Sequence, residues 1–190
     1  MAEMVKKATR ESFGETVTAL AAEYPEIVVL DADLAAATKT GIFKKAYPER
    51  FFDCGIAECN MVGVAAGLAT CGKIPFAASF AMFSAGRAFE QVRNSVGYPK
   101  LNVKIVGSDP GITTALNGGT HMPLEDAAMY LSIPETTVLD PADYDQLASI
   151  TRQLVNIDKG VTYTRFVRKG IIQVVRRGKR VRDRQGCGAA

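Results

Sequence analysis

The sequence is poor in the residue types that bind metals. It has one histidine, His121, and four cysteines, none of which forms a Cys-x-x-Cys pair. A structural zinc site needs four nitrogen or sulfur ligands at short spacings, so this scarcity argues against one. The cysteines, at positions 54, 59, 71 and 187, are expected to be reduced and mostly buried thiols. We therefore predict no metal site among this chain's own residues.

Long apolar runs are absent as well. None of the 190 residues belongs to a stretch approaching the ~20 apolar residues that a membrane-spanning helix needs. The first residues also lack the apolar segment of a secretory signal. Hydrophobic residues make up 47% and charged residues 23%, as is typical of a globular protein. We expect a cytoplasmic protein of one domain that does not bind membranes.

The net charge of +3 does not describe a basic body. From Val174 onward the chain holds six basic residues against one acidic residue, Asp183, so the remainder carries −2. A protein that binds nucleic acid usually presents a basic face or stripe. We therefore predict no nucleic-acid partner.

The chain divides into a domain over residues 1–170 and a basic tail over residues 171–190. The tail has no helical or strand periodicity and is predicted to be disordered.

Short apolar runs alternate with amphipathic segments along the domain. This alternation predicts an α/β fold, a doubly wound and mostly parallel sheet of about six strands with helices on both faces. Predicted strands cover residues 27–30, 51–52, 74–78, 103–106, 136–139 and 161–166, and predicted helices cover residues 6–24, 41–47, 60–70, 86–96, 124–131 and 142–155.

Polar and aromatic side chains follow the ends of several predicted strands. Parallel strands present their carboxyl ends at one edge of a sheet, where doubly wound folds bind ligands. We expect a binding site at this edge from the side chains that follow the first four strands, namely Asp31, Asp33, Glu58, Ser79, Phe80, Ser108 and Asp109.

One segment carries a family resemblance. The run Asp53-Cys-Gly-Ile-Ala-Glu-Cys-Asn-Met61 resembles the sequence around the cofactor-activating glutamate of transketolases. The resemblance continues in order through Asp31-Ala-Asp-Leu34, Thr38-Lys-Thr-Gly-Ile-Phe-Lys-Lys45, Pro75-Phe-Ala-Ala-Ser-Phe-Ala-Met-Phe83 and Gly86-Arg-Ala-Phe-Glu-Gln-Val-Arg93, and it fades after about residue 170. The chain is thus identified as similar to the pyrimidine-binding domain of that family.

The resemblance implies a site for the aminopyrimidine end of thiamine diphosphate. Glu58 matches the carboxyl group that hydrogen-bonds N1′ of this ring, with Ile56, Met61 and Val62 as apolar surroundings. Phe80 and Phe83 match the walls of the ring pocket, and Asp33 and Leu34 match a loop that approaches the cofactor. The residues alone also permit an ordinary helix-start glutamate, core aromatics and a loop-turn acid.

Substrate contacts are implied in the same way. Arg10 and Arg168 match arginines that grip the substrate phosphate, although both also suit a solvated surface. His121 matches a polar contact near the reacting carbons, and a structural histidine is the alternative. The chain departs from the family pattern at three positions: Ala37 replaces a serine, Asp109 a histidine and Asn117 an aspartate. Together these three changes predict an altered sugar specificity, and Asp109 and Asn117 are expected to bind the substrate.

The Gly-Asp-Gly motif that marks the metal–diphosphate site of the family is missing. The resemblance therefore implies a partner chain, an N-terminal transketolase subunit that binds the diphosphate and Mg²⁺ or Ca²⁺, in a homodimer or heterotetramer. This chain would be the C-terminal subunit of a split transketolase, in a truncated form. Codons for its tail, read one base over, can spell the acidic segment that joins this domain to the next in the family, which suggests a frameshift.

Three functions remain open on the sequence. The chain is a subunit that helps to transfer a two-carbon ketol group between sugar phosphates. Alternatively, it belongs to a transketolase-like or deoxyxylulose-phosphate synthase-like enzyme with a non-standard sugar. In the third case it is a truncated domain that folds and pairs with a partner but catalyses no reaction.

Overall fold

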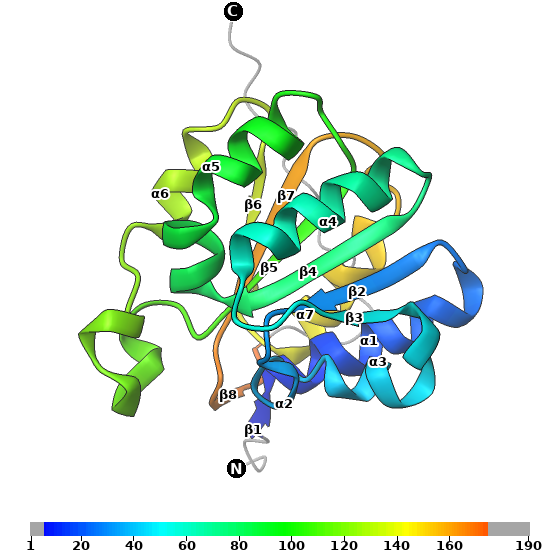
Figure 1. Cartoon of the computed structure of the whole chain (residues 1–190). Helices are drawn as coiled ribbons and strands as arrows, with labels where there is room; N and C mark the ends of the chain where they lie inside the picture. Colours follow the sequence, from blue (N-terminus) through cyan, green and yellow to red (C-terminus); the bar gives the residue numbers. More distant parts are fainter. Residues whose placement is uncertain (1–5, 175–190) are drawn as a thin grey trace, which may run out of the picture.

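A parallel six-stranded sheet forms the centre of the protein, as the computed structural model describes it for residues 6–174 (Figure 1). The strand order is β3-β2-β4-β5-β7-β6, and every neighbouring pair runs parallel. This arrangement, with helices on both faces, confirms the predicted fold class. The strands are β2 (Ile27–Asp31), β3 (Phe51–Asp53), β4 (Ile74–Phe80), β5 (Val103–Ser108), β6 (Thr137–Leu139) and β7 (Val161–Phe166).

Helices α4, α5 and α6 cover one face of this sheet, and α1, α3 and α7 cover the other (Figure 1). The α-helices are α1 (Thr9–Glu23), α2 (Ala35–Thr38), α3 (Gly41–Ala46), α4 (Glu58–Thr70), α5 (Phe89–Gln91), α6 (Asp126–Leu131) and α7 (Tyr144–Leu154). Short 3₁₀ segments are η1 (Pro48–Arg50), η4 (Gly111–Asn117) and η5 (Gly119–His121), and wide π-helical turns are η2 (Phe83–Arg87) and η3 (Val92–Gly97). The predicted helix over residues 86–96 is therefore longer, and only its centre is α-helical.

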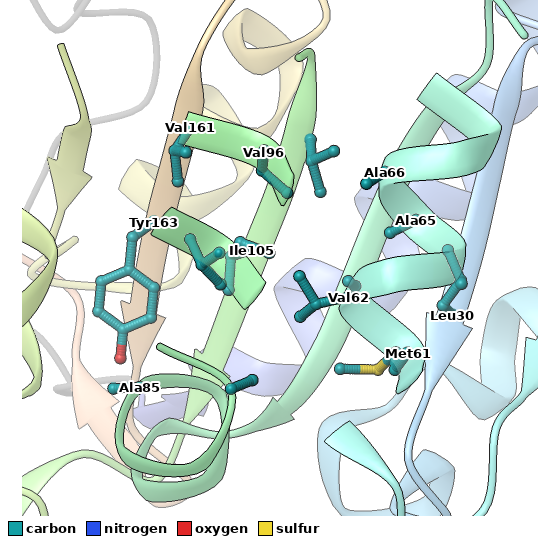
Figure 2. Packing of buried hydrophobic residues seen from close by; sticks show 14 of the residues in the cluster. Leu30, Met61, Val62, Ala65, Ala66, Ala85, Val96, Ile105, Val161 and Tyr163 are labelled. Carbon is teal, nitrogen blue, oxygen red and sulfur yellow. The ribbon is translucent and has the colours of Figure 1, made fainter. Parts of the chain in front are cut away.

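Two apolar clusters lie on opposite faces of the sheet because strand side chains alternate in direction. In β2, Val28 and Leu30 join the cluster under α4, whereas Ile27 and Val29 join the cluster under α1 and α7. Figure 2 shows the first cluster, in which Val62 and Ala65 of α4 face the strands. Burial on both faces explains why the strands appear in the sequence as short continuous apolar runs.

A second, two-stranded sheet was not predicted. β1 (Lys6–Ala8) pairs antiparallel with β8 (Gly170–Ile172), so the first helix begins at Thr9 and not at residue 6. Strand β8 also continues for two residues beyond the predicted domain boundary at residue 170. A pairing between residues more than 160 positions apart leaves no periodic signal in such short strands. The remainder of the predicted basic tail, residues 175–190, lies outside the described part of the chain.

The described cysteines are less buried than expected. Cys54 and Cys59 are half-buried, and Cys71 is exposed, all with free thiols. The expectation of mostly buried thiols is therefore wrong for these three, and Cys187 falls outside the described residues.

Between residues 6 and 174, no helix is both long enough and apolar enough to cross a membrane.

Lys104 is an unusual member of the central strand, because its side chain is fully buried. Its Nζ donates a hydrogen bond of 2.6 Å to the carbonyl oxygen of Ile157. Burial lowers the pKa of Lys104 to about 8, and the nearby charge of Asp158 opposes this shift. The folded protein therefore releases this proton at a lower pH than the unfolded chain does.

We predict a rise in stability with pH that depends on Lys104. Below about pH 8 both states hold the proton, and between about pH 8 and 10.5 only the unfolded chain holds it. The unfolded state then binds more protons, so the free energy of unfolding increases with pH, by about 3 kcal/mol over this window. Denaturant unfolding of the wild type and of Lys104→Met, repeated across this pH range, measures the increase. The difference between the two proteins isolates Lys104, since the other titrating groups are common to both. A stability difference that stays constant from pH 8 to 10.5 would contradict the assignment.

Candidate active site

The register of the sheet brings the predicted site residues to one edge. Phe80 at the end of β4 lies opposite Ser108 of β5, and Ser108 lies opposite Phe166 of β7. On the other side of β4, Asp31 lies opposite Ala78. The loops that leave these strands therefore start side by side, as the strand-end pattern predicted.

Glu58 is the first residue of α4, and its side chain is only 1% exposed. Both interpretations from the sequence thus apply together, because it is a helix-start residue and a buried carboxyl group. Arg87 Nη1 donates a hydrogen bond of 2.8 Å to Glu58 Oε2. Across residues 6–174, Oε1 receives no hydrogen bond. Met61 and Val62 are fully buried beside it, whereas Ile56 is 76% exposed in this chain, so its predicted place in the apolar surroundings of the cofactor stays a prediction.

Phe80, Phe83 and His121 form an aromatic group. The ring centroids of Phe80 and Phe83 are 5.9 Å apart, and His121 lies edge-on to both at 6.1 and 5.1 Å. The Arg87 guanidinium carbon lies 4.8 Å from the centroid of Phe83, so the same arginine contacts the aromatic group and Glu58. A carboxyl group and aromatic faces within one small region suit a flat, polar heterocycle.

The loop after β2 is held by the last residue of that strand, which was predicted only to lie at the binding edge of the sheet. Asp31 is fully buried and accepts hydrogen bonds from Leu34 N at 2.5 Å and from the hydroxyls of Thr38 and Thr40 at 2.8 Å. Burial raises the pKa of Asp31, and these hydrogen bonds oppose the shift. Asp33 is exposed with a left-handed φ of 61°, and its amide donates to Asp53 Oδ1 at 3.1 Å.

A third group lies beyond β5 and β7. Asp109 is 1% exposed, and Arg168 Nε lies 3.4 Å from its Oδ2. Arg10 Nη1 donates to the carbonyl oxygen of Ala37 at 3.3 Å. Burial raises the pKa of Asp109, while the positive charges of Arg168 and then Arg10 oppose the shift. Arg10 and Arg168, predicted as anion contacts, therefore both lie close to one buried acid.

Asn117 is not joined to these groups. It lies half-buried at the end of η4, in the segment that projects from the sheet between β5 and α6 (Figure 1). No hydrogen bond or ion pair of its side chain to another predicted site residue occurs in the part of the chain described. No role was predicted for Arg87, although it lies in one of the motifs that carry the family resemblance. A pair 29 residues apart could be recognised only from the packing of α4 against η2.

Comparison with known proteins gives a consistent result. The sequence profile described as transketolase, pyrimidine binding domain, matches residues 5–171. A Methanocaldococcus jannaschii protein described as a transketolase C-terminal section is 49% identical over 165 residues, which are 87% of this chain and 52% of that protein. A Clostridium protein named 6-deoxy-6-sulfo-D-fructose transketolase subunit is 46% identical over 165 residues, with 87% and 51% covered.

Solved structures agree with these sequence matches. A structure named split gene transketolase, inactive beta4 tetramer, superposes with a TM-score of 0.81 at 48% identity, and it covers 92% of this chain and 56% of that one. The chain thus spans about half the length of the curated relatives it matches.

Between residues 6 and 174, no group of three or more His, Cys, Asp or Glu side chains is placed to hold a metal ion.

Proposed function

Because the chain belongs to the transketolase family and consists largely of its pyrimidine-binding domain, we propose that it is one chain of a split, thiamine-diphosphate-dependent transketolase. In this proposal the assembled enzyme transfers a two-carbon ketol group between sugar phosphates. The observation that carries the proposal is the buried carboxyl group of Glu58, whose Oε1 accepts no hydrogen bond within residues 6–174 and whose partner Arg87 contacts the aromatic ring of Phe83.

The described residues fit the aminopyrimidine end of the cofactor. When bound, thiamine diphosphate supplies a carbon nucleophile and an electron sink for the cleavage of a carbon–carbon bond. Glu58 would hold a proton between Oε1 and N1′ of the ring, and Arg87 would fix the orientation of the carboxyl group through Oε2. Phe80 and Phe83 would pack against the ring and exclude water. Asp33 and Leu34 would approach the same end from the loop after β2.

The partner is proposed from the relatives. One relative is described as a C-terminal section and one solved relative as a split-gene enzyme, so a second chain with the diphosphate-binding domain is the natural complement. That N-terminal subunit would supply the diphosphate and Mg²⁺ or Ca²⁺ site, in a dimer or a heterotetramer. His121 would contact the substrate near its reacting carbons.

Two alternatives each have one observation in their favour. The relative named for 6-deoxy-6-sulfo-D-fructose supports a transketolase with a non-standard sugar, as do the changed residues Ala37, Asp109 and Asn117. The solved relative named as an inactive beta4 tetramer supports a chain that assembles without turnover when its partner is missing. A deoxyxylulose-phosphate synthase-like activity and a cytoplasmic location stay predictions from the sequence.

Reconstitution separates these possibilities. We expect the chain alone to show no ketol transfer, and the chain mixed with an N-terminal transketolase subunit, thiamine diphosphate and Mg²⁺ to release an aldose from a ketose donor. The measurement is donor-dependent formation of the new ketose, with each subunit omitted in turn as the control. Complex formation without turnover on any phosphorylated or sulfonated ketose would support the inactive assembly and contradict the enzymatic proposal.

A further inference from the structure

Two arginines from distant parts of the chain converge on one buried acid at the edge of the sheet. Arg10 lies in the first turn of α1, Arg168 follows β7, and Asp109 follows β5. Arg168 Nε is 3.4 Å from Asp109 Oδ2, and the charge of Arg10 also acts on this carboxyl group. The three side chains together carry a charge of +1.

Several polar atoms of this cluster have no hydrogen-bond partner within residues 6–174, although Oδ2 of Asp109 is ion-paired with Arg168. Both carboxylate oxygens of Asp109 are buried without a hydrogen bond, and so is Nε of Arg10. Asp109 itself is 99% buried, since its exposed fraction is 1%. Buried polar atoms in folded proteins nearly always have partners. Arg10 Nε is a donor that an oxygen of an anionic ligand can satisfy, whereas the Asp109 oxygens are acceptors that need a donor such as a substrate hydroxyl or a water.

The backbone holds Asp109 firmly in this position. Its amide donates a hydrogen bond of 3.0 Å to the carbonyl oxygen of Phe166, and its own carbonyl oxygen accepts one of 2.5 Å from Thr114 Oγ1. The residue has a left-handed φ of 58°, which Asp, Asn and Gly adopt most readily. The acid is therefore a built part of the site and not a surface side chain that can turn away.

We propose that Arg10, Arg168 and Asp109 form a site for a tetrahedral anion with a single negative charge, such as a sulfonate, and that Asp109 sets this charge preference. The inference rests on the proposed function in one respect, because it assigns the anion to the terminal group of the sugar substrate. The binding preference itself concerns only this chain.

The preference for a monoanion follows from the charges of the cluster and of the two kinds of anion. A phosphate monoester carries about −1.5 to −2 at neutral pH, whereas a sulfonate carries −1. Two guanidinium groups alone would match a dianion, but Asp109 already neutralises one of them. The carboxylate repels a dianion about twice as strongly as a monoanion at the same distance, and the low dielectric of a buried site magnifies the difference. Removing this negative charge must therefore favour the dianion more than the monoanion.

The test compares two small anions on the full chain at pH 8, without cofactor or partner. Binding of methanesulfonate and of inorganic phosphate is measured by NMR titration for the wild type, for Asp109→Asn and for Glu135→Gln. Asn keeps the shape of the side chain and tolerates the left-handed backbone. Glu135 is 64% exposed and pairs with Lys100, so its replacement removes an equal charge away from the cluster. Asp109→Gly serves as a second variant if the first folds poorly, with circular dichroism to monitor the fold.

We expect the wild type to bind methanesulfonate in preference to phosphate. In Asp109→Asn the ratio of phosphate to methanesulfonate affinity should rise by at least about tenfold, and in Glu135→Gln it should not change. An unchanged ratio in Asp109→Asn, or a wild type that binds neither anion, would overturn the inference.

A second experiment tests whether this site binds the terminal group of the sugar substrate. In the complex with the partner subunit, the preference for a 6-sulfonated over a 6-phosphorylated ketose, measured as the ratio of kcat/KM values, should fall by a similar factor in Asp109→Asn. If the complex turns over neither ketose while the small-anion preference holds, the proposed function fails and the charge-selective site stands. If turnover occurs with an unchanged preference in the variant, the assignment of this site to the substrate is wrong.

Discussion

Glu58→Gln is expected to lower kcat of the reconstituted enzyme by about 10²- to 10⁴-fold, the usual contribution of a group that transfers a proton. Gln has the same shape and keeps a hydrogen-bond acceptor for Arg87, but it cannot share a proton with a ligand at Oε1. The fold should persist, because removing a charge from a side chain that is 1% exposed relieves desolvation, and Arg87 is half exposed to water. Steady-state kinetics with the partner subunit, thiamine diphosphate and Mg²⁺ measures the loss.

The control is Glu49→Gln. Glu49 is 67% exposed and lies 3.6 Å from Arg50 Nε, so the same substitution there alters only a surface ion pair. Its kcat should equal that of the wild type, and both variants should unfold at the same temperature as the wild type within a few degrees. Retention of more than about a tenth of wild-type kcat in Glu58→Gln would contradict the role proposed for this residue.

Asp126→Ala is expected to destabilise the protein by about 3–5 kcal/mol, because it removes one partner of a buried ion pair. Asp126 is fully buried at the start of α6 and accepts hydrogen bonds of 2.7 Å from Arg165 Nη1 and from Tyr163 Oη. Without it, a largely buried guanidinium and a buried phenol lose their acceptor. Burial, and next the charge of Asp126, raise the pKa of Tyr163 well above its ordinary value, so this phenol is a neutral donor that needs the acceptor.

The destabilisation caused by Asp126→Ala should extend toward the candidate active site. Tyr130, on the same helix, stacks on Tyr163 at 3.9 Å, and its hydroxyl donates to the carbonyl oxygen of Ser84, the neighbour of Phe83. Figure 2 shows Tyr163 with its hydroxyl toward the turn that contains Ala85. Urea unfolding measures the change in the free energy of unfolding, and hydrogen exchange in η2 reports whether the turn loosens.

Asp140→Ala provides the matched control. Asp140 lies 3.2 Å from Arg165 Nε but is 61% exposed, so water replaces it and the loss should be below about 1 kcal/mol. Equal destabilisation by the two variants would show that burial of Asp126 does not set the strength of this contact.

The order of strands and helices followed from the sequence, because apolar runs and their spacing reflect burial on the two faces of the sheet. The strand-end side chains followed as well, since parallel strands end at one edge. Strand β5 was predicted to end at Val106 and continues to Ser108. A Cβ at Gly107 would lie 2.4 Å from Tyr163 Oη, and only the position of Tyr163 on the neighbouring strand reveals why glycine is there.

By itself the sequence determined the fold class and the family, and it predicted the candidate glutamate and aromatic residues, because these depend on local pattern and on ordered motifs. Tertiary structure alone decided which charges meet: Arg87 with Glu58, Arg165 with Asp126, and Arg168 with Asp109. The physical reason is that an ion pair needs two side chains within about 4 Å. For residues 29 to 59 positions apart, that distance is set by how helices and loops pack on the sheet.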